Sequence, residues 1–201
     1  MKLYYSATSP YVRKVNVFTI EAGLDDKIEN ITTNPWVSDA SLLADNPLSK
    51  VPTLILDDGT VLYDSPVICE YLDSLNTGQK LIPVAGMERW MALRLQALGD
   101  GILDAAVMRF LERKRPEVQQ SSDWDATQLS AIQRALVYLE SNIDDWNKDL
   151  TVGQITVGCA LGYLDFRFAN DSWRDNQPLL AKWYSSFAER TSMQITQPRS
   201  V

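Results

Sequence analysis

The sequence contains no histidine and only two cysteines among its 201 residues. Without imidazole, the chain cannot build a Ser-His-Asp or Cys-His nucleophile pair, or a zinc site that needs histidine. Cys69 and Cys159 lie inside apolar helical patterns, so we expect buried thiols that are neither catalytic nor disulfide-bonded. Any activation of a thiol or hydroxyl must therefore come from hydrogen bonds, helix dipoles or charges.

Long apolar runs and excess positive charge are missing too. No stretch of about 18 apolar residues exists, and Ser6–Lys14 interrupts the apolar start of the chain. We therefore expect neither a membrane-spanning helix nor a signal peptide, and a cytoplasmic location. The net charge of −7 argues against non-specific binding to nucleic acid or anionic membrane. Hydrophobic content of 45% is that of an ordinary globular protein.

The first 75 residues alternate between strand and helix signals. We predict strands over residues 2–6, 27–32, 52–56 and 61–63, and helices over 10–22 and 65–75. Residues 34–46 have the composition of a loop, with room for one helical turn, and Asp57-Asp58-Gly59 predicts a hairpin turn. Ser65 is expected to cap the second helix, with Pro66 at its first position. The predicted order is βαβ followed by ββα.

The remainder of the chain is predicted to be helical. Residues 76–86 have the Gly, Pro and polar composition of a linker, and no strand is expected beyond them. Helices are predicted over 87–113, 125–143, 155–168 and 178–189. The first of these is expected to bend or break near Gly99 and Gly101.

A capping box precedes the third of these helices. Thr151 and Gln154 have the required spacing, and Leu150 and Ile155 fit the hydrophobic staple around them. The helix that follows is apolar on nearly every side. It is therefore predicted to be the buried centre of an all-helical domain.

The most informative element is the turn Ser9-Pro10-Tyr11-Val12, between an apolar strand and an amphipathic helix. Free backbone N–H groups and the positive end of the helix dipole favour an anion at such a position. The turn resembles the active-site turn of thioredoxin-like proteins, where glutaredoxins carry Cys-Pro-Tyr-Cys. Both sulfurs are absent here, so dithiol–disulfide exchange is excluded. The sulfur is expected to arrive on a ligand.

Three motifs, in this order and spacing, carry a resemblance to the soluble glutathione transferases over essentially the whole chain. They are Ser9-Pro10-Tyr11-Val12-Arg13-Lys14, Asn46-Pro47-Leu48-Ser49-Lys50-Val51-Pro52, and Asp64-Ser65-Pro66 with Ile68 and Glu70-Tyr71-Leu72. The run from Ala160 to Phe168 is also similar to bacterial members. One departure is Gln154, because the family's capping box usually ends in aspartate.

This resemblance implies an α/β thioredoxin-like, glutathione-binding domain over residues 1–75, a linker over 76–86 and an all-α domain over 87–201. It also implies a transferase that stabilises the glutathione thiolate and adds it to a small apolar electrophile. Glutathione would be the co-substrate, with no other cofactor and no metal. Nucleic acid and membranes are not expected as partners.

Ser9 is the expected hydrogen-bond donor to the thiolate, with Thr8 as the alternative hydroxyl and Arg13 as a further source of positive field. A shift of one to two pKa units needs about 1.4–2.7 kcal/mol, which one charge-assisted hydrogen bond and a helix dipole can supply. The local sequence alone equally fits a Ser9 that merely caps the helix. It also fits an Arg13 on a solvated basic face.

Four further residues are implied to hold glutathione. Val51-Pro52 resembles the family's cis-proline turn, which leaves the Val51 N–H and C=O free for the cysteinyl backbone. Lys50 would contact the glycyl carboxylate, and Ser65 the γ-glutamyl carboxylate at a helix N-terminus. Asp64 would accept from the ammonium group. A surface lysine and a turn aspartate are the alternative interpretations of Lys50 and Asp64.

The electrophile is expected in an apolar cleft between the two halves, with Tyr11, Met108 and Trp173 as candidate lining residues. Core packing explains each of these three equally well. The 87–101 helix has more apolar residues than one buried face needs, which together with the resemblance predicts a homodimer. These residues are Trp90, Met91, Leu93, Leu95 and Leu98.

Two other functions remain open. A glutathione-dependent isomerase or dehalogenase would need the same thiolate. A non-catalytic binding module would keep the fold without turnover, although such a module has no need of the ligand-holding set from Lys50 to Ser65.

Overall fold

The computed structural model describes residues 1–34, 36–37, 39–146 and 149–199, and these form two compact units. The first unit comprises Met1–Arg89 and the C-terminal segment that begins at Thr191. The second unit, called the helical unit below, comprises Trp90–Arg190. The expected limits placed residues 191–201 with the helices, whereas the structure groups that segment with the first unit.

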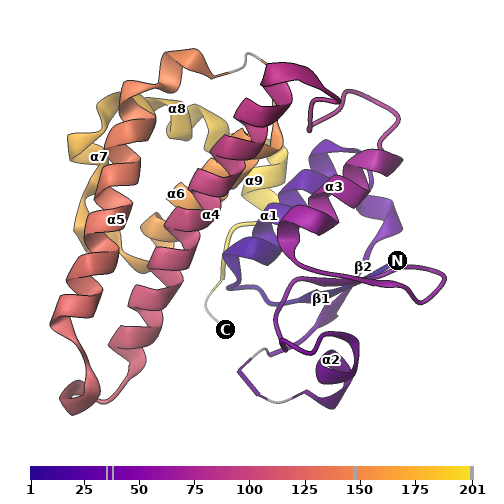
Figure 1. Ribbon diagram of the computed structural model, residues 1–201, viewed down its shortest axis with the longest axis horizontal. Coiled ribbons are helices and arrows are strands. Elements are labelled where there is room, and N and C mark those ends of the chain that lie inside the picture. Colours follow the sequence, from indigo (N-terminus) through magenta and orange to yellow (C-terminus); the bar gives the residue numbers. More distant parts are fainter. Residues whose placement is uncertain (35, 38, 147–148, 200–201) are drawn as a thin grey trace. The chain divides into compact units, whose positions relative to one another are not determined.

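A four-stranded mixed sheet in the order β2-β1-β3-β4 forms the centre of the first unit. Its strands are β1 (Lys2–Tyr5), β2 (Glu29–Thr32), β3 (Thr53–Ile55) and β4 (Val61–Leu62). The helices are α1 (Pro10–Glu21), α2 (Ala40–Asp45), α3 (Ser65–Leu75) and α9 (Thr191–Ile195). Figure 1 shows α1 and α3 on one side of the sheet and α2 on the other. The predicted thioredoxin-like fold is confirmed.

Local differences from the predicted elements have simple causes. A 3₁₀ turn over Asp25–Lys27 shortens β2 at its start. Helix α2 forms inside the predicted loop, because Asp39 accepts from two backbone N–H groups at its start and Leu42 is fully buried. The N-cap of α3 is Asp64 rather than the expected Ser65, which is the first helical residue.

The helical unit contains no strand among its described residues. Its helices are α4 (Gly86–Lys114, which begins in the first unit), α5 (Ser122–Ser141), α6 (Val152–Arg167), α7 (Trp173–Asn176) and α8 (Pro178–Ala188). Every residue of α6 from Val152 to Leu164 is buried, which confirms the predicted central helix. No helix in the described part of the chain is long and apolar enough to cross a membrane.

The predicted capping box begins α6. The Thr151 N–H donates to Gln154 Oε1 over 2.7 Å, and the Thr151 side chain accepts from the Gln154 backbone. Both residues are buried, and their two side chains together satisfy two N–H groups that the helix itself leaves without partners, one of them through the neutral glutamine.

Helix α4 is continuous from Gly86 to Lys114, so the expected break near Gly99 and Gly101 is wrong. Gly99 instead allows close packing, because a Cβ there would lie 2.8 Å from Thr156 Cγ2 of α6. Gly153 serves the same purpose from α6, since its Cβ would lie 2.8 Å from the Ala92 carbonyl oxygen of α4. Small residues on both helices therefore bring their backbones together.

We predict that Gly153→Ala lowers the free energy of unfolding by about 1–3 kcal/mol, because the Ala92 backbone cannot move aside. Gly101→Ala is the matched control, since a Cβ there meets nothing within 4 Å. That change should raise stability by up to about 1 kcal/mol through better helix propensity. Urea denaturation of both variants measures the difference. Equal effects would show that the close approach of α4 and α6 does not matter.

Candidate functional site

The register of the sheet brings three turns to one end of it. Tyr4 of β1 pairs with Thr53 of β3, so the turn that leaves β1 lies beside the segment that enters β3. Because β4 is antiparallel to β3, with Leu62 opposite Leu54, the chain leaving β4 reaches the same end. These three segments carry Ser9, Lys50 and Val51, and Asp64 and Ser65. The predicted ligand-holding residues therefore lie on neighbouring segments.

Ser9 is the N-cap of α1. Its Oγ accepts from the Val12 N–H over 3.3 Å, and its carbonyl accepts from the Arg13 N–H. A hydroxyl that accepts still has its own proton to donate, so capping leaves Ser9 able to bind an anion. Thr8, also half-buried, forms no side-chain hydrogen bond with the described residues.

Arg13 does not lie on a solvated basic face, so that alternative is wrong. Its side chain is 7% exposed, and its neighbour Lys14 is fully buried. Nη2 of Arg13 donates over 3.0 Å to the Met193 carbonyl of α9. Arg13 therefore ties the C-terminal segment to the first unit, which explains the grouping of residues 191–195 with the sheet.

The Val51–Pro52 peptide bond is cis, as the resemblance implied. Val51 packs in one apolar cluster with Tyr4, Val12 and Leu42, so the first turn of α1 and the segment before β3 are in the same core. Neither the N–H nor the C=O of Val51 has a hydrogen-bond partner within the described ranges. These two groups are available to a ligand backbone.

A buried hydrogen-bond network that the sequence analysis missed holds this segment. Nδ2 of Asn46 donates to the Lys50 carbonyl (3.1 Å) and to Thr53 Oγ1 (2.9 Å), while Oδ1 accepts from the Leu48 N–H. Thr53 Oγ1 donates to the same Lys50 carbonyl. Asn46 is 1% exposed. The Asn-Pro dipeptide at 46–47 was the available signal for an ordered turn.

Tyr4 cannot supply a free hydroxyl at this end of the sheet. Its phenol donates to Asp45 Oδ2 over 2.8 Å. Burial, followed by the hydrogen bond and charge of Asp45, raises the pKa of Tyr4 to about 12. Tyr4 thus stays protonated and joins the end of α2 to β1.

Several polar groups around these turns have no partner among the described residues. Lys50 and Asp64 are exposed, and neither forms an ion pair with the residues that the structure describes. The Asp64 side chain accepts no hydrogen bond from the first N–H groups of α3, so it leaves those groups open to a ligand. Ser65 is 2% exposed, yet its hydroxyl bonds to no described residue. A cation, an anion, a hydroxyl and helix N–H groups suit a zwitterionic ligand with carboxylates.

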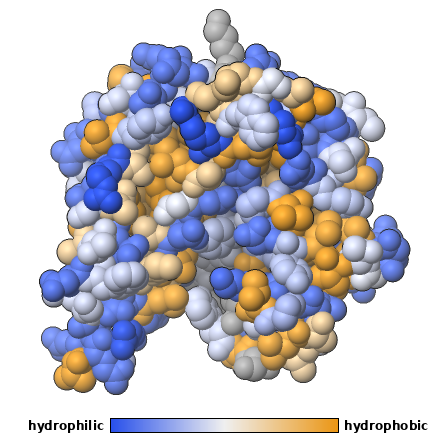
Figure 2. Space-filling model, viewed as in Figure 1, coloured by the Kyte–Doolittle hydropathy of each residue, from blue (hydrophilic) through white to orange (hydrophobic). Residues whose placement is uncertain are grey.

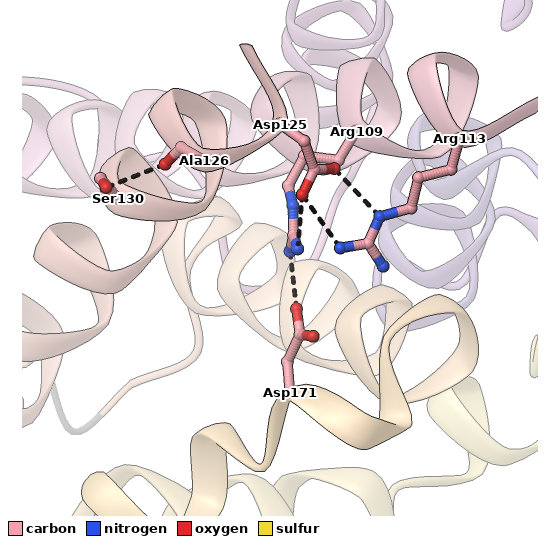
Figure 3. Close-up of polar contacts among 6 residues, drawn as sticks. All are labelled: Arg109, Arg113, Asp125, Ala126, Ser130 and Asp171. Atoms are coloured by element: carbon pink, nitrogen blue, oxygen red, sulfur yellow. Dashed lines mark hydrogen bonds and ion pairs between the residues drawn. The ribbon is translucent and has the colours of Figure 1, made fainter. Parts of the chain in front are cut away.

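The buried arginine of the helical unit is paired with carboxylates. Figure 3 shows Arg109, which is 1% exposed, between Asp171 (2.6 Å) and Asp125 (3.3 Å), with Arg113 bound to both oxygens of Asp125. Burial of Asp125 acts to raise its pKa, but the hydrogen bonds from Arg113 and Arg109 outweigh it and lower the pKa. Carboxylates held ionised in this way join helices and are unsuited to acid–base catalysis.

The candidate electrophile residues belong to different units. Tyr11 is half-buried in α1, whereas Met108 on α4, 46% exposed, and Trp173 on α7 belong to the helical unit. Trp173 is 6% exposed, donates to Asp165 Oδ1 over 2.9 Å and meets Tyr184 edge to face. For Trp173 the structure therefore shows core packing. An electrophile pocket lined by these three residues stays a prediction.

Comparisons with known proteins agree with this geometry. A family model described as "Glutathione S-transferase, N-terminal domain" matches residues 8–75. The uncharacterized GST-like protein YibF of Escherichia coli K12 is 35% identical over 201 residues, which cover 98% of each protein.

Two solved structures from Pseudomonas fluorescens Pf-5, described as a glutathione transferase family member, are similar over nearly the whole chain. The one with bound glutathione is 42% identical with a TM-score of 0.94, and covers 99% of both chains. The one with bound S-(propanoic acid)-glutathione is 40% identical with a TM-score of 0.92, and covers 100% of both.

We predict that Asn46→Ala lowers the free energy of unfolding by about 1–3 kcal/mol, because it removes three hydrogen bonds from a buried network. Asn34→Ala is the matched control, since the Asn34 side chain accepts a single bond, from the Trp36 N–H, on the surface. Its cost should stay below about 0.5 kcal/mol. Thermal or urea unfolding measures both. An Asn46 variant as stable as the control would show that the network does not hold the Lys50 segment.

Proposed function

Because the chain belongs to the glutathione transferase family, we propose that it binds glutathione at the end of the sheet and transfers it to a small apolar electrophile. One observation carries this proposal. Around Ser9, the Lys50 ammonium, the Val51 N–H and C=O, the Asp64 carboxylate and the Ser65 hydroxyl have no hydrogen-bond or ion-pair partner among the described residues, and they match the charged and peptide groups of glutathione.

In this proposal the ligand is held at three points. The Val51 N–H and C=O pair with the cysteinyl backbone. The Lys50 ammonium contacts the glycyl carboxylate. At the start of α3, Ser65 and the helix N–H groups bind the γ-glutamyl carboxylate, while Asp64 accepts from the ligand ammonium.

Ser9 acts on the sulfur. A free thiol has a pKa of about 8.5, so only a few per cent is ionised at neutral pH. The Ser9 hydroxyl donates to the sulfur, and the N-terminus of α1 adds its dipole, so the thiol proton leaves to solvent more readily. The thiolate then forms a carbon–sulfur bond to the electrophile. In a displacement the leaving group departs with the negative charge, and in an addition the charge moves onto the electrophile, which then takes up a proton. Thr8 is the alternative donor.

The ligands in the Pseudomonas fluorescens structures correspond to the substrate and the product class of this reaction. One relative contains glutathione and the other a glutathione thioether, S-(propanoic acid)-glutathione. A thioether is the product class that conjugation yields. The buried thiols Cys69 and Cys159 play no part, and a cytoplasmic location, where thiols stay reduced, fits them.

Two alternatives share the fold. Glutathione-dependent isomerisation or dehalogenation would use the same thiolate, and turnover of an aryl halide separates conjugation from these. A binding module without catalysis finds support in an exposed apolar surface near α2. Figure 2 shows hydrophobic residues over that edge, and Trp36, Val37, Leu43 and Leu48 are each at least 43% exposed.

Retention on immobilised glutathione tests binding directly. The wild-type protein should be retained and eluted by free glutathione. Ser65→Ala should weaken binding by about tenfold, the loss expected for one hydrogen bond to a carboxylate. A wild-type chain that passes through the resin, and shows no binding by calorimetry, would contradict the proposed ligand.

We predict that Ser9→Ala lowers turnover of an aryl halide at neutral pH by about ten- to a thousandfold, because one preorganised donor to the sulfur is lost. Glutathione affinity should change little, since other residues hold the ligand. Ultraviolet titration of bound glutathione should show the thiol pKa rising toward its free value. Removing the cap should also cost about 1 kcal/mol of stability.

Ser121→Ala is the matched control for this loss of stability. Ser121 caps α5 by accepting from the Trp124 N–H over 3.2 Å. The Ser121→Ala variant should lose a similar free energy of unfolding and keep the turnover of wild type. If Ser9→Ala and wild type give overlapping thiol titrations, Ser9 is a helix cap alone, and Thr8→Ala tests the other hydroxyl.

We also propose that the protein is a homodimer. Trp90 is 62% exposed and Met91 37% exposed on the helical unit, and such apolar surface favours a protein partner. Light scattering should give twice the 22.7 kDa chain mass. Trp90→Asp should yield monomers, whereas Trp124→Asp, which replaces another exposed tryptophan, should not. A wild-type monomer at micromolar concentration would contradict the dimer.

A further inference from the structure

Arg167, the last residue of α6, is surrounded by aromatic rings. Its guanidinium carbon lies 4.2 Å from the ring centroids of both Phe110 and Phe166, and 6.0 Å from that of Tyr163. Rings at these distances attract a cation and hold a planar guanidinium in one orientation. All four residues belong to the helical unit.

The charge of Arg167 is not balanced by a carboxylate. Several other arginines of this unit are paired, among them Arg109 with Asp171 and Arg174 with Asp165. Arg167 forms no ion pair with the described residues. Its nearest acidic neighbour in sequence, Asp165, already accepts from both Arg174 and Trp173. Arg167 is thus a well-positioned cation with no counterion among the residues that the structure describes.

Its nitrogens differ in accessibility. Nε is enclosed and without a hydrogen-bond partner, whereas the side chain as a whole is only partly buried. The terminal Nη groups are therefore the ones that remain for a ligand, and the side chain also forms a hydrogen bond with the Tyr163 hydroxyl. Two such groups in one plane match the two oxygens of a carboxylate.

Two neighbours strengthen this position. Tyr163 is 4% exposed, and burial raises the pKa of its phenol, against a smaller lowering by Arg167. The phenol is thus protonated at neutral pH and can donate a hydrogen bond. Lys114 lies 5.4 Å from the Phe110 ring centroid and also has no ion pair within the described ranges. A second positive charge on the same ring adds to the attraction for an anion.

We propose that Arg167, Tyr163 and Lys114 form an anion site in the helical unit for the carboxylate of a small aromatic acid. The Arg167 Nη groups bind the carboxylate oxygens side by side, and the Tyr163 hydroxyl donates a further bond. The rings of Phe110 and Phe166 hold the guanidinium and offer apolar contact to the body of the acid. The site is built within one unit and does not depend on glutathione.

Titration with benzoate, in the absence of glutathione, tests the site, with benzamide as the neutral ligand of the same shape. Calorimetry should detect benzoate and not benzamide, and added salt should weaken the binding. The ¹⁵N-detected Nε–H signal of Arg167 should shift with benzoate alone. Arg167→Met keeps the apolar packing between the rings, and it should lower the affinity for benzoate by at least about tenfold.

Arg167→Lys should bind at an intermediate level, because it keeps the charge without the planar fork. Arg94→Met is the matched control, since Arg94 also stacks on an aromatic ring, that of Tyr138, 5.9 Å away. It should bind benzoate like wild type. Equal binding of benzoate and benzamide, or an Arg167→Met variant with unchanged affinity, would overturn the proposal and leave Arg167 a purely structural cation. Retention of Arg167→Met on immobilised glutathione reports separately on the proposed function.

Discussion

The antiparallel pairing of β1 with β3 is the constraint on which the candidate site depends. The pairing of Tyr4 with Thr53 brings the end of β1 beside the start of β3. The pairing of β3 with β4 brings a third turn to the same end of the sheet. A shift of one residue would turn the side chains of a strand to the opposite face. The apolar cluster of Tyr4, Val12, Leu42 and Val51 opposes such a shift, because it would have to be exposed.

Given this register, the polar groups at the end of the sheet divide into two kinds. Some form internal hydrogen bonds that hold the turns. Asn46 and Thr53 both donate to the Lys50 carbonyl, and Tyr4 donates to Asp45. Others, such as the Ser65 hydroxyl and the Val51 backbone, are held in place and have no partner in the part of the chain that the structure describes. Such preorganised groups bind a ligand without the entropy cost of first being ordered.

Particular residues show how far sequence reasoning reached. The capping box of Thr151 and Gln154 and the buried helix α6 were predicted, because each depends on a few neighbouring residues, whereas the cis-proline turn at Val51 was implied by the family resemblance. The glycines of α4 were misinterpreted. A glycine in a helix suggests a bend, but Gly99 is there because Thr156, 57 positions away in the chain, packs on it.

The same limit applies to charge. Arg13 and Lys14 follow the helix start in a pattern that fits a solvated face, yet both are buried, and Arg13 bonds to Met193 at the other end of the chain. Arg167 is one arginine among many in the sequence. Only the positions of Phe110 and Phe166, and the pairing of Asp165 with Arg174, distinguish it from the arginines that are already neutralised.

By itself the sequence determined the order of strands and helices, the turns and caps between them, and the absence of histidine chemistry. These follow from local propensity, hydrophobic period and composition, which act over a few residues. The tertiary structure alone decided which helices approach closely, which polar groups are consumed by internal hydrogen bonds and which charges have no counterion. Those outcomes depend on contacts between residues far apart in the chain, and packing sets them only when the whole unit folds.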